Sequence, residues 1–184
     1  MAWIESRKKQ SGGGGEKGLI VFASTPAIIP FKDNSDYEIF IEYEMPFFVR
    51  SCVIGTSGGQ DAYLHLTPWG ETSLYAGKGN GEQVISTTQT DLYGRHTFKY
   101  NHDGGIYFDD VYRTTASPTN SQNISIAGRG SYRFSGVIWY ASITSISTGD
   151  LVCELVPREV NGTAGLYDTI NDEFYPLGSY VLEF

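Results

Sequence analysis

The chain has 184 residues, 40% of them hydrophobic, so it can form one domain that buries roughly 70% of its unfolded surface. Thirteen basic residues against twenty-one acidic ones give a net charge of −8, which argues against nucleic acid or an anionic membrane as the partner. No apolar run approaches the roughly 20 residues of a membrane-spanning helix, and the first residues lack the apolar core of a signal peptide, so we expect no Sec export.

A short head and a glycine-rich linker come first in the chain. The head, MAWIESRKKQ, carries the apolar residues Trp3 and Ile4, and the following QSGGGGEKG has the composition of a flexible linker. We therefore divide the chain into a tether at residues 1–17 and a domain at residues 18–184. Trp3 and Ile4 are predicted to attach the protein to a partner through residues 1–10, and a disordered terminus is the alternative.

From residue 18 onward, short strand patterns alternate with turn residues, and no stretch shows a convincing helical period. In DYEIFIEYEM, residues 36–45, tyrosine, isoleucine and methionine share one face, while the acidic residues and Phe40 share the other. Further strands are predicted at residues 51–56, 62–67, 73–77, 95–100, 105–113, 123–128, 136–146, 151–157 and 173–177. Ten or so strands in one domain predict an all-β fold of two antiparallel sheets, a sandwich or jelly roll.

The strand at residues 36–45 is also similar to the catalytic strand of laminarinase-type β-glucanases, because it contains Glu-Ile-Phe-Ile-Glu. Retaining hydrolysis needs two carboxylates about 5 Å apart in opposite protonation states, and in those enzymes an aspartate between the glutamates tunes them. Phe40 occupies that position, and a phenyl ring can neither accept a proton nor hold a carboxylate. We therefore predict that Glu38 and Glu42 lie on a solvated strand face and that the protein is not an enzyme.

No other catalytic pattern replaces the missing aspartate. The sequence contains no HExxH pair, no Gly-x-Ser-x-Gly elbow and no phosphate-binding loop. Cys52 and Cys153 are the only cysteines, which excludes a CxxC metal site and a dense disulfide framework. Two buried thiols are expected, and a disulfide across the sandwich is the alternative. A glycoside hydrolase with displaced catalytic residues stays the least favoured hypothesis.

Residues 93–110, YGRHTFKYNHDGGIYFDD, predict a strand, a tight turn at residues 101–105 and a second strand. The stretch resembles a pattern of laminin G-like domains in which Trp-His opens one strand and Asp-Gly closes its partner. In this chain Arg95-His96 stands at the first place and Asp109-Asp110 at the second.

Two later stretches extend the resemblance. FSGVIWYASI, residues 134–143, is similar to a strand of concanavalin A-like lectin and glucanase domains. GLYDTINDEFYPLGS, residues 165–179, resembles the ending of laminin G-like domains in bacteriophage structural and tail proteins. The resemblance covers residues 18–184 and implies a concanavalin A-like jelly roll.

The same resemblance implies a place and a partner. We expect a virion protein, extracellular after host lysis, that contacts other virion proteins through residues 1–10 and binds host-associated carbohydrate without hydrolysing it. A purely structural decoration or assembly protein is the alternative. The sequence does not identify the sugar. It also leaves the oligomeric state open, because no coiled-coil period supports a trimer.

A glycan site needs aromatic rings that stack on sugars and polar groups that bind hydroxyls. Residues 61–75, DAYLHLTPWGETSLY, offer both, and Trp69 stands in a Pro-Trp-Gly stretch that reads as an accessible turn. Packing of Trp69 over the sandwich rim is the alternative, and Trp139, in mid-strand, is predicted to be core. The predicted carbohydrate-binding residues are Asp61, Tyr63, His65, Trp69 and Tyr75.

Laminin G-like domains often hold Ca²⁺ at the sandwich rim, so the resemblance also implies a calcium site. Asp103, Asp109 and Asp110 would supply the oxygen ligands that this ion prefers. No EF-hand spacing is present, and turn-forming aspartates explain these positions equally well. No other cofactor is expected.

Overall fold

The computed structural model describes most of the chain between Glu16 and Glu183. The described residues are 16–22, 25–32, 36–45, 52–56, 66–69, 73–78, 81–86, 93–101, 105–114, 123–129, 132–177 and 180–183. Every regular element within them is a β-strand. None of these residues forms a helix that is long and apolar enough to cross a membrane.

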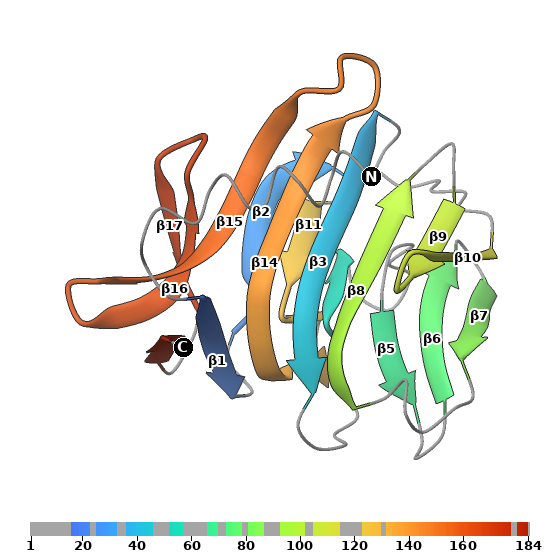
Figure 1. Cartoon of the computed structure of the whole chain (residues 1–184), viewed down its shortest axis with the longest axis horizontal. Coiled ribbons are helices and arrows are strands. Elements are labelled where there is room, and N and C mark those ends of the chain that lie inside the picture. Colours follow the sequence, from blue (N-terminus) through green and yellow to red (C-terminus); the bar gives the residue numbers. More distant parts are fainter. Residues whose placement is uncertain are drawn as a thin grey trace.

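A large antiparallel sheet forms the front layer of the molecule (Figure 1). Its strand order is β10-β9-β8-β3-β14-β15-β16-β17, and β1 pairs with both β14 and β18. Its strands are β1 (Lys17–Phe22), β3 (Tyr37–Met45), β8 (Gly94–Asn101), β9 (Gly105–Phe108), β10 (Val111–Thr114), β14 (Ser135–Ser145), β15 (Leu151–Val160), β16 (Thr163–Asp168), β17 (Glu173–Pro176) and β18 (Tyr180–Glu183).

A smaller antiparallel sheet lies behind it, in the order β2-β11-β4-β5-β6-β7. Its strands are β2 (Ala27–Lys32), β4 (Ile54–Thr56), β5 (Leu66–Trp69), β6 (Ser73–Lys78), β7 (Gly81–Ser86) and β11 (Asn123–Ile126). A short pair, β12 (Gly128–Arg129) and β13 (Tyr132–Arg133), forms a separate two-stranded ladder beside the small sheet. The predicted all-β sandwich of two antiparallel sheets is confirmed.

The core lies between the two sheets and follows the predicted alternation of β3. Ile39, Ile41 and Tyr43 of this strand are fully buried in one cluster with residues of the small sheet such as Ile29 and Ile124. Because successive side chains of a strand point to opposite faces, the residues between them face outward. The predicted division of the 36–45 strand into a core face and an outer face is therefore correct.

A β-bulge in β14 changes which of its residues face the core. Ile138 pairs with Tyr43 and Tyr140 pairs with Glu42, so Trp139 is an extra residue with no partner position on β3. Trp139 is buried, at 9% exposure, but its indole contacts groups on the outer face of the large sheet. The prediction that Trp139 is buried is correct, while its assignment to the core between the sheets is wrong.

Some predicted strands differ from the observed ones. The hairpin at residues 101–105 is confirmed, since Asn101 pairs with Gly105, whose φ is +112°. The predicted strand at residues 105–113 is instead two strands, β9 and β10, because Asp109 and Asp110 adopt φ values of +49° and +61° and form a tight turn. The predicted strands also omitted β1, β2, β7, β13, β16 and β18. In β7 and β16, a glycine and few β-branched residues obscure the strand pattern.

The C-terminal stretch that begins at Gly165 contributes most of the β16–β17 hairpin. A Cβ atom on Gly165 would lie 2.3 Å from the backbone oxygen of Tyr175 and 2.7 Å from the ring of Phe174. Gly165 therefore leaves room for the ring of Phe174 on the neighbouring strand. An aromatic residue at position 174 in this arrangement requires a glycine at position 165.

Asp168, in the same stretch, anchors the loop between these strands. Its fully buried carboxylate accepts hydrogen bonds from the backbone N–H groups of Glu154, Ile170 and Asn171 and from the Asn171 side chain at 2.7 Å. Burial by itself raises the pKa of Asp168, but the bonds from Asn171, the Cys153 thiol and the backbone outweigh it and hold this pKa below its usual value.

Both cysteines are buried thiols, and no disulfide joins them. The Cys52 thiol donates to the backbone oxygen of Ile54 at 3.1 Å. Burial, together with the hydrogen bond to Asp168, raises the pKa of Cys153 far above that of an ordinary thiol. The expectation of two buried thiols is correct, and Cys153 supports the loop anchored by Asp168.

Replacing Gly165 by alanine should lower the free energy of unfolding by about 3 kcal/mol, because neither the backbone oxygen nor the ring beside it can move away freely. Gly162→Ala is the control: nothing lies within 4 Å of its added Cβ, and only its φ of +76° is unfavourable, at about 1 kcal/mol. Urea denaturation of both variants measures the difference. Equal losses would contradict the packing of Phe174 against Gly165.

Asp168→Asn should lower the free energy of unfolding at neutral pH by about 2–3 kcal/mol, because an amide cannot accept all these bonds. A carboxyl group whose pKa is lowered by folding stabilises the protein above its unfolded pKa of about 3.9, and that stability is lost as the pH falls through the folded pKa. The stability of the variant should therefore fall less than that of the wild type below about pH 4. Parallel acid unfolding curves would refute this.

Candidate functional site

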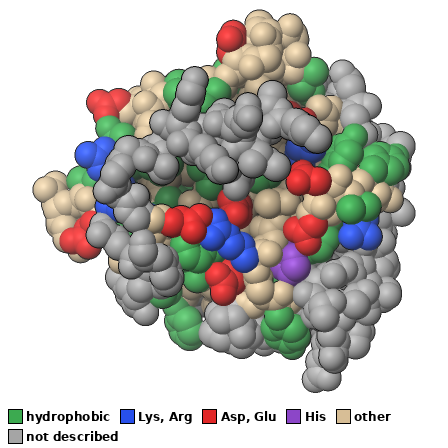
Figure 2. Space-filling model, in the orientation of Figure 1, with side chains coloured by type: hydrophobic (Ala, Val, Ile, Leu, Met, Phe, Trp, Pro, Cys, Tyr) green, Lys and Arg blue, Asp and Glu red, His purple; other side chains and the backbone are tan. Residues whose placement is uncertain are grey.

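Six side chains form a line across the outer face of the large sheet, perpendicular to its strands. Each pairs with the next through the strand register, from β10 at one edge to β15 beyond the centre. In order they are Tyr112, Tyr107, Lys99, Phe40, Ser142 and Glu154. Figure 2 shows this face, with acidic and basic side chains gathered near its centre. We call this line the cross-strand row.

The end of the row at β10 is open to solvent. Tyr112 is 49% exposed, and its ring meets that of Tyr107 edge to face at a centroid distance of 5.6 Å. The Lys99 ammonium lies 4.4 Å from the Tyr107 ring centroid and 3.9 Å from a carboxylate oxygen of Glu38. Asn101 donates to the same Glu38 carboxylate at 3.0 Å. Aromatic faces and groups that bind hydroxyls therefore stand side by side here.

The other half of the row is nearly buried. Phe40 is 6% exposed and lies 6.1 Å from the Tyr140 ring, while Ser142 is 1% exposed. Glu154, at 7% exposure, accepts hydrogen bonds from the hydroxyl groups of Tyr140, at 3.3 Å, and Thr169. This half therefore places a buried serine and a buried glutamate beside two aromatic rings.

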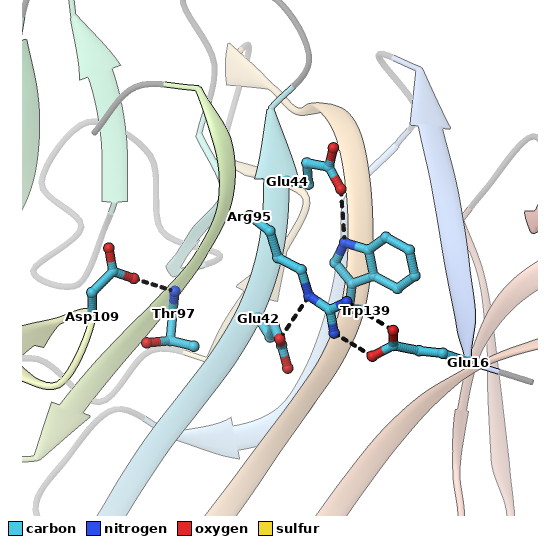
Figure 3. Close-up of polar contacts among 7 residues, drawn as sticks. All are labelled: Glu16, Glu42, Glu44, Arg95, Thr97, Asp109 and Trp139. Atoms are coloured by element: carbon cyan, nitrogen blue, oxygen red, sulfur yellow. Dashed lines mark hydrogen bonds and ion pairs between the residues drawn. The ribbon is translucent and has the colours of Figure 1, made fainter. Parts of the chain in front are cut away.

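A charged cluster borders the row toward the C-terminal end of β3 and the start of β8 (Figure 3). The Arg95 guanidinium donates to Glu42 at 2.8 Å and to both oxygens of Glu16, the residue directly before β1. It also lies 4.2 Å above the Trp139 ring, whose N–H donates to Glu44 at 3.3 Å. The hydrogen bonds with Glu16, followed by the charge of Glu42, raise the pKa of Arg95 above its ordinary value. Arg95 therefore covers Trp139 and remains charged.

The prediction that Glu38 and Glu42 lie in water is wrong for Glu42. Glu42 is 7% exposed because it sits beside Arg95, whereas Glu38 is half-buried and bound to Asn101 and Lys99. The sequence pattern identified the face correctly but did not reveal the cation that faces Glu42. Phe40 stands between the two glutamates on this face, so the aspartate of the glucanase motif has no substitute there.

Of the five predicted sugar-binding residues, the structure describes two, Trp69 and Tyr75. Asp61, Tyr63 and His65 lie outside the described residues. Trp69 is the last residue of β5, paired with Ser73, and does not stand in a turn as predicted. Tyr75 lies on β6, so both aromatic residues belong to the small sheet, away from the cross-strand row. Their role in binding stays a prediction.

The predicted metal ligands are only partly described. Asp103, like Trp3 and Ile4 of the head, lies outside the described residues. Asp109 is engaged within the protein: one carboxylate oxygen contacts His96 Nδ1 at 2.8 Å and the other accepts the backbone N–H of Thr97 at 2.9 Å. In the part of the chain that the structure describes, no three metal-binding side chains come together. Calcium binding stays a prediction.

The sequence did not single out the cross-strand row, because its members lie on six different strands. Tyr107 and Tyr112 both occur in the single strand predicted at residues 105–113, and only the observed register shows that Tyr107 lies between Tyr112 and Lys99. The sequence does contain one signal for this pair. Tyr107 and Tyr112 are equally distant from Asp109 and Asp110, and a two-residue turn at the aspartates brings the two tyrosines opposite each other.

No protein-family model and no curated protein sequence matches the chain. A solved structure from Bacteroides ovatus, described as a "putative carbohydrate binding protein", is similar to it with a TM-score of 0.64 and 10% sequence identity. The similarity covers 92% of this chain and 59% of that protein, so the chain spans about three fifths of its length. At this identity the likeness shows a shared β-sandwich fold.

Glu42→Gln should lower the free energy of unfolding by about 1 kcal/mol, because it breaks a largely buried ion pair while Glu16 still holds Arg95. The control Glu38→Gln keeps an acceptor for Asn101 on a more exposed side chain and should change stability by less than about 0.5 kcal/mol. Thermal denaturation at low and high salt measures both. A larger loss for Glu38→Gln would contradict the assigned roles.

Proposed function

We propose that this protein binds carbohydrate on the outer face of the large sheet, along the cross-strand row. The observation that carries the proposal is the open end of the row, where Tyr112 and Tyr107 lie beside Lys99, Asn101 and Glu38. Sugar rings stack their apolar C–H faces on aromatic rings, while carboxylate, amide and ammonium groups bind their hydroxyls. The shared fold with the Bacteroides protein, itself described as a "putative carbohydrate binding protein", supports carbohydrate binding but does not locate the site.

Binding without hydrolysis fits the chemistry of this face. The carboxylates of Glu38 and Glu42 are both engaged by cationic side chains, and Phe40 separates them along β3. Retaining hydrolysis needs one carboxyl group as a proton donor and the other as a nucleophile, about 5 Å apart. We therefore assign the protein a binding role, and the expected assay result is a glycan that is retained and not cleaved.

Tyr112→Ala should weaken glycan binding about tenfold and leave the melting temperature nearly unchanged, because the ring is exposed and stacks on the ligand. A glycan array supplies the ligand, and calorimetry on the best hit measures the dissociation constant. The matched control is Phe22→Ala, an exposed aromatic residue at the end of β1, which should bind as the wild type does. Unchanged binding by Tyr112→Ala would reject this face as the site.

The small sheet supplies the second candidate site, which rests on the predicted residues Trp69 and Tyr75. The same titration discriminates the two candidates, because Trp69→Ala should then reduce affinity by roughly 1–3 kcal/mol while Tyr112→Ala has no effect. A loss of stability with unchanged binding would show that Trp69 is a packing residue.

The biological setting of the proposal comes from the sequence. The C-terminal stretch GLYDTINDEFYPLGS supports a phage virion module of the laminin G-like type, attached through residues 1–10. In that setting the sandwich would present the cross-strand row to host-associated glycans. A structural decoration protein without a glycan ligand is the alternative, and a glycan array without any hit would favour it.

A further inference from the structure

The buried end of the cross-strand row is an incomplete polar site. Ser142 and Glu154 face each other on β14 and β15, and both are more than nine-tenths buried. The Ser142 hydroxyl has no hydrogen-bond partner among the described residues. The donors that the structure describes around the Glu154 carboxylate are two hydroxyl groups, those of Tyr140 and Thr169, and neither carries a charge.

Such an arrangement is unfavourable unless a further group completes it. A buried carboxylate is costly without a positive partner, and a buried hydroxyl is costly without a hydrogen bond. One compact cation with several N–H donors, placed between the two side chains, would satisfy both. The rings of Phe40 and Tyr140, 6.1 Å apart beside this position, would add attraction for a positive charge.

The structure assigns this position to a protonated amino group of the glycan: we propose that the Ser142–Glu154 site binds the ammonium group of an amino sugar. This inference rests on the proposed function and specifies its ligand. An ammonium group is compact, carries a positive charge and donates three hydrogen bonds. An acetylated amine has no charge and is bulkier, and a hydroxyl group brings no charge to Glu154.

The rest of the face favours the same ligand. Among the described residues of the outer face, five carboxylates stand against three cations, Arg95, Lys99 and Arg158, the last on the same side of β15 as Glu154. The carboxylates are those of Glu16, Glu38, Glu42, Glu44 and Glu154. Arg95 is already bound by two carboxylates, and Lys99 by one. The described part of this surface is therefore negative on balance, which favours a cationic glycan over one that carries carboxylates or sulfates.

The geometry also indicates the direction of the bound chain. The row crosses six neighbouring strands, so Tyr112 and Glu154 are about 24 Å apart at a strand spacing of about 4.8 Å. An oligosaccharide that stacks on Tyr112 and places an amine at Glu154 therefore lies across the strands and needs several sugar units.

The test uses three β-1,4-linked hexasaccharides that differ only in the group at carbon 2: an amine in the glucosamine oligomer, an acetamide in the N-acetylglucosamine oligomer and a hydroxyl in cellohexaose. At a pH where the amine is protonated, the glucosamine oligomer should bind the full chain at least about tenfold more tightly than the other two. Raising the pH until the amine is neutral should remove this preference, while the affinity for cellohexaose stays constant.

Single substitutions test whether the preference for the amine arises at Ser142 and Glu154. Glu154→Gln should abolish the preference for the amine, and Ser142→Ala should reduce it. Glu159→Gln, on the same strand but exposed, should retain it. Melting temperatures show whether each variant is folded, and the pH series on the wild type tests the inference without any substitution.

The outcomes separate the two proposals. Equal affinities for the three hexasaccharides, or a preference that survives Glu154→Gln, would overturn the amine site and leave carbohydrate binding intact. Binding of other glycans on the array without any response to the glucosamine oligomer would also overturn the amine site alone. No binding to any glycan would overturn the proposed function, and this inference with it.

Discussion

The pairing of β3 with β14 is the constraint on which the rest of the structure depends. These two central strands run antiparallel over almost their whole length, and their register sets the residues on both faces of the large sheet. Inward, Ile39 and Ile41 contribute to the buried core; outward, Phe40 lies beside Ser142 in the cross-strand row. A shift by one residue would exchange the two faces, so the core and the candidate site are specified together.

The bulge at Trp139 shows how this pairing also places polar groups. Upstream of the bulge Ile138 faces the core, and downstream Ala141 does, so both Trp139 and Tyr140 reach the outer face. Trp139 then supports Arg95, and Tyr140 donates to Glu154. The one inserted residue therefore places Trp139 in the charged cluster and the next residue, Tyr140, at the buried end of the cross-strand row.

The C-terminal stretch has a structural role that accounts for its pattern. Gly165 makes room for the Phe174 ring, and Asp168 holds the intervening loop through its buried carboxylate. These residues stabilise a hairpin at the edge of the large sheet, several strands away from Tyr112. The residues of this stretch that the structure explains therefore specify packing of the fold and say nothing about a ligand.

The sequence by itself determined the all-β class, the two faces of β3, the hairpin at Asn101 and Gly105, and the two buried thiols. These features depend on alternation, turn chemistry and composition, which act over a few residues. Only the tertiary structure decided that Asp109 and Asp110 separate two strands, that Arg95 covers Trp139, and that Tyr112 is aligned with Glu154. The reason is physical: these relations depend on strand register and a bulge, which bring together residues from distant parts of the chain.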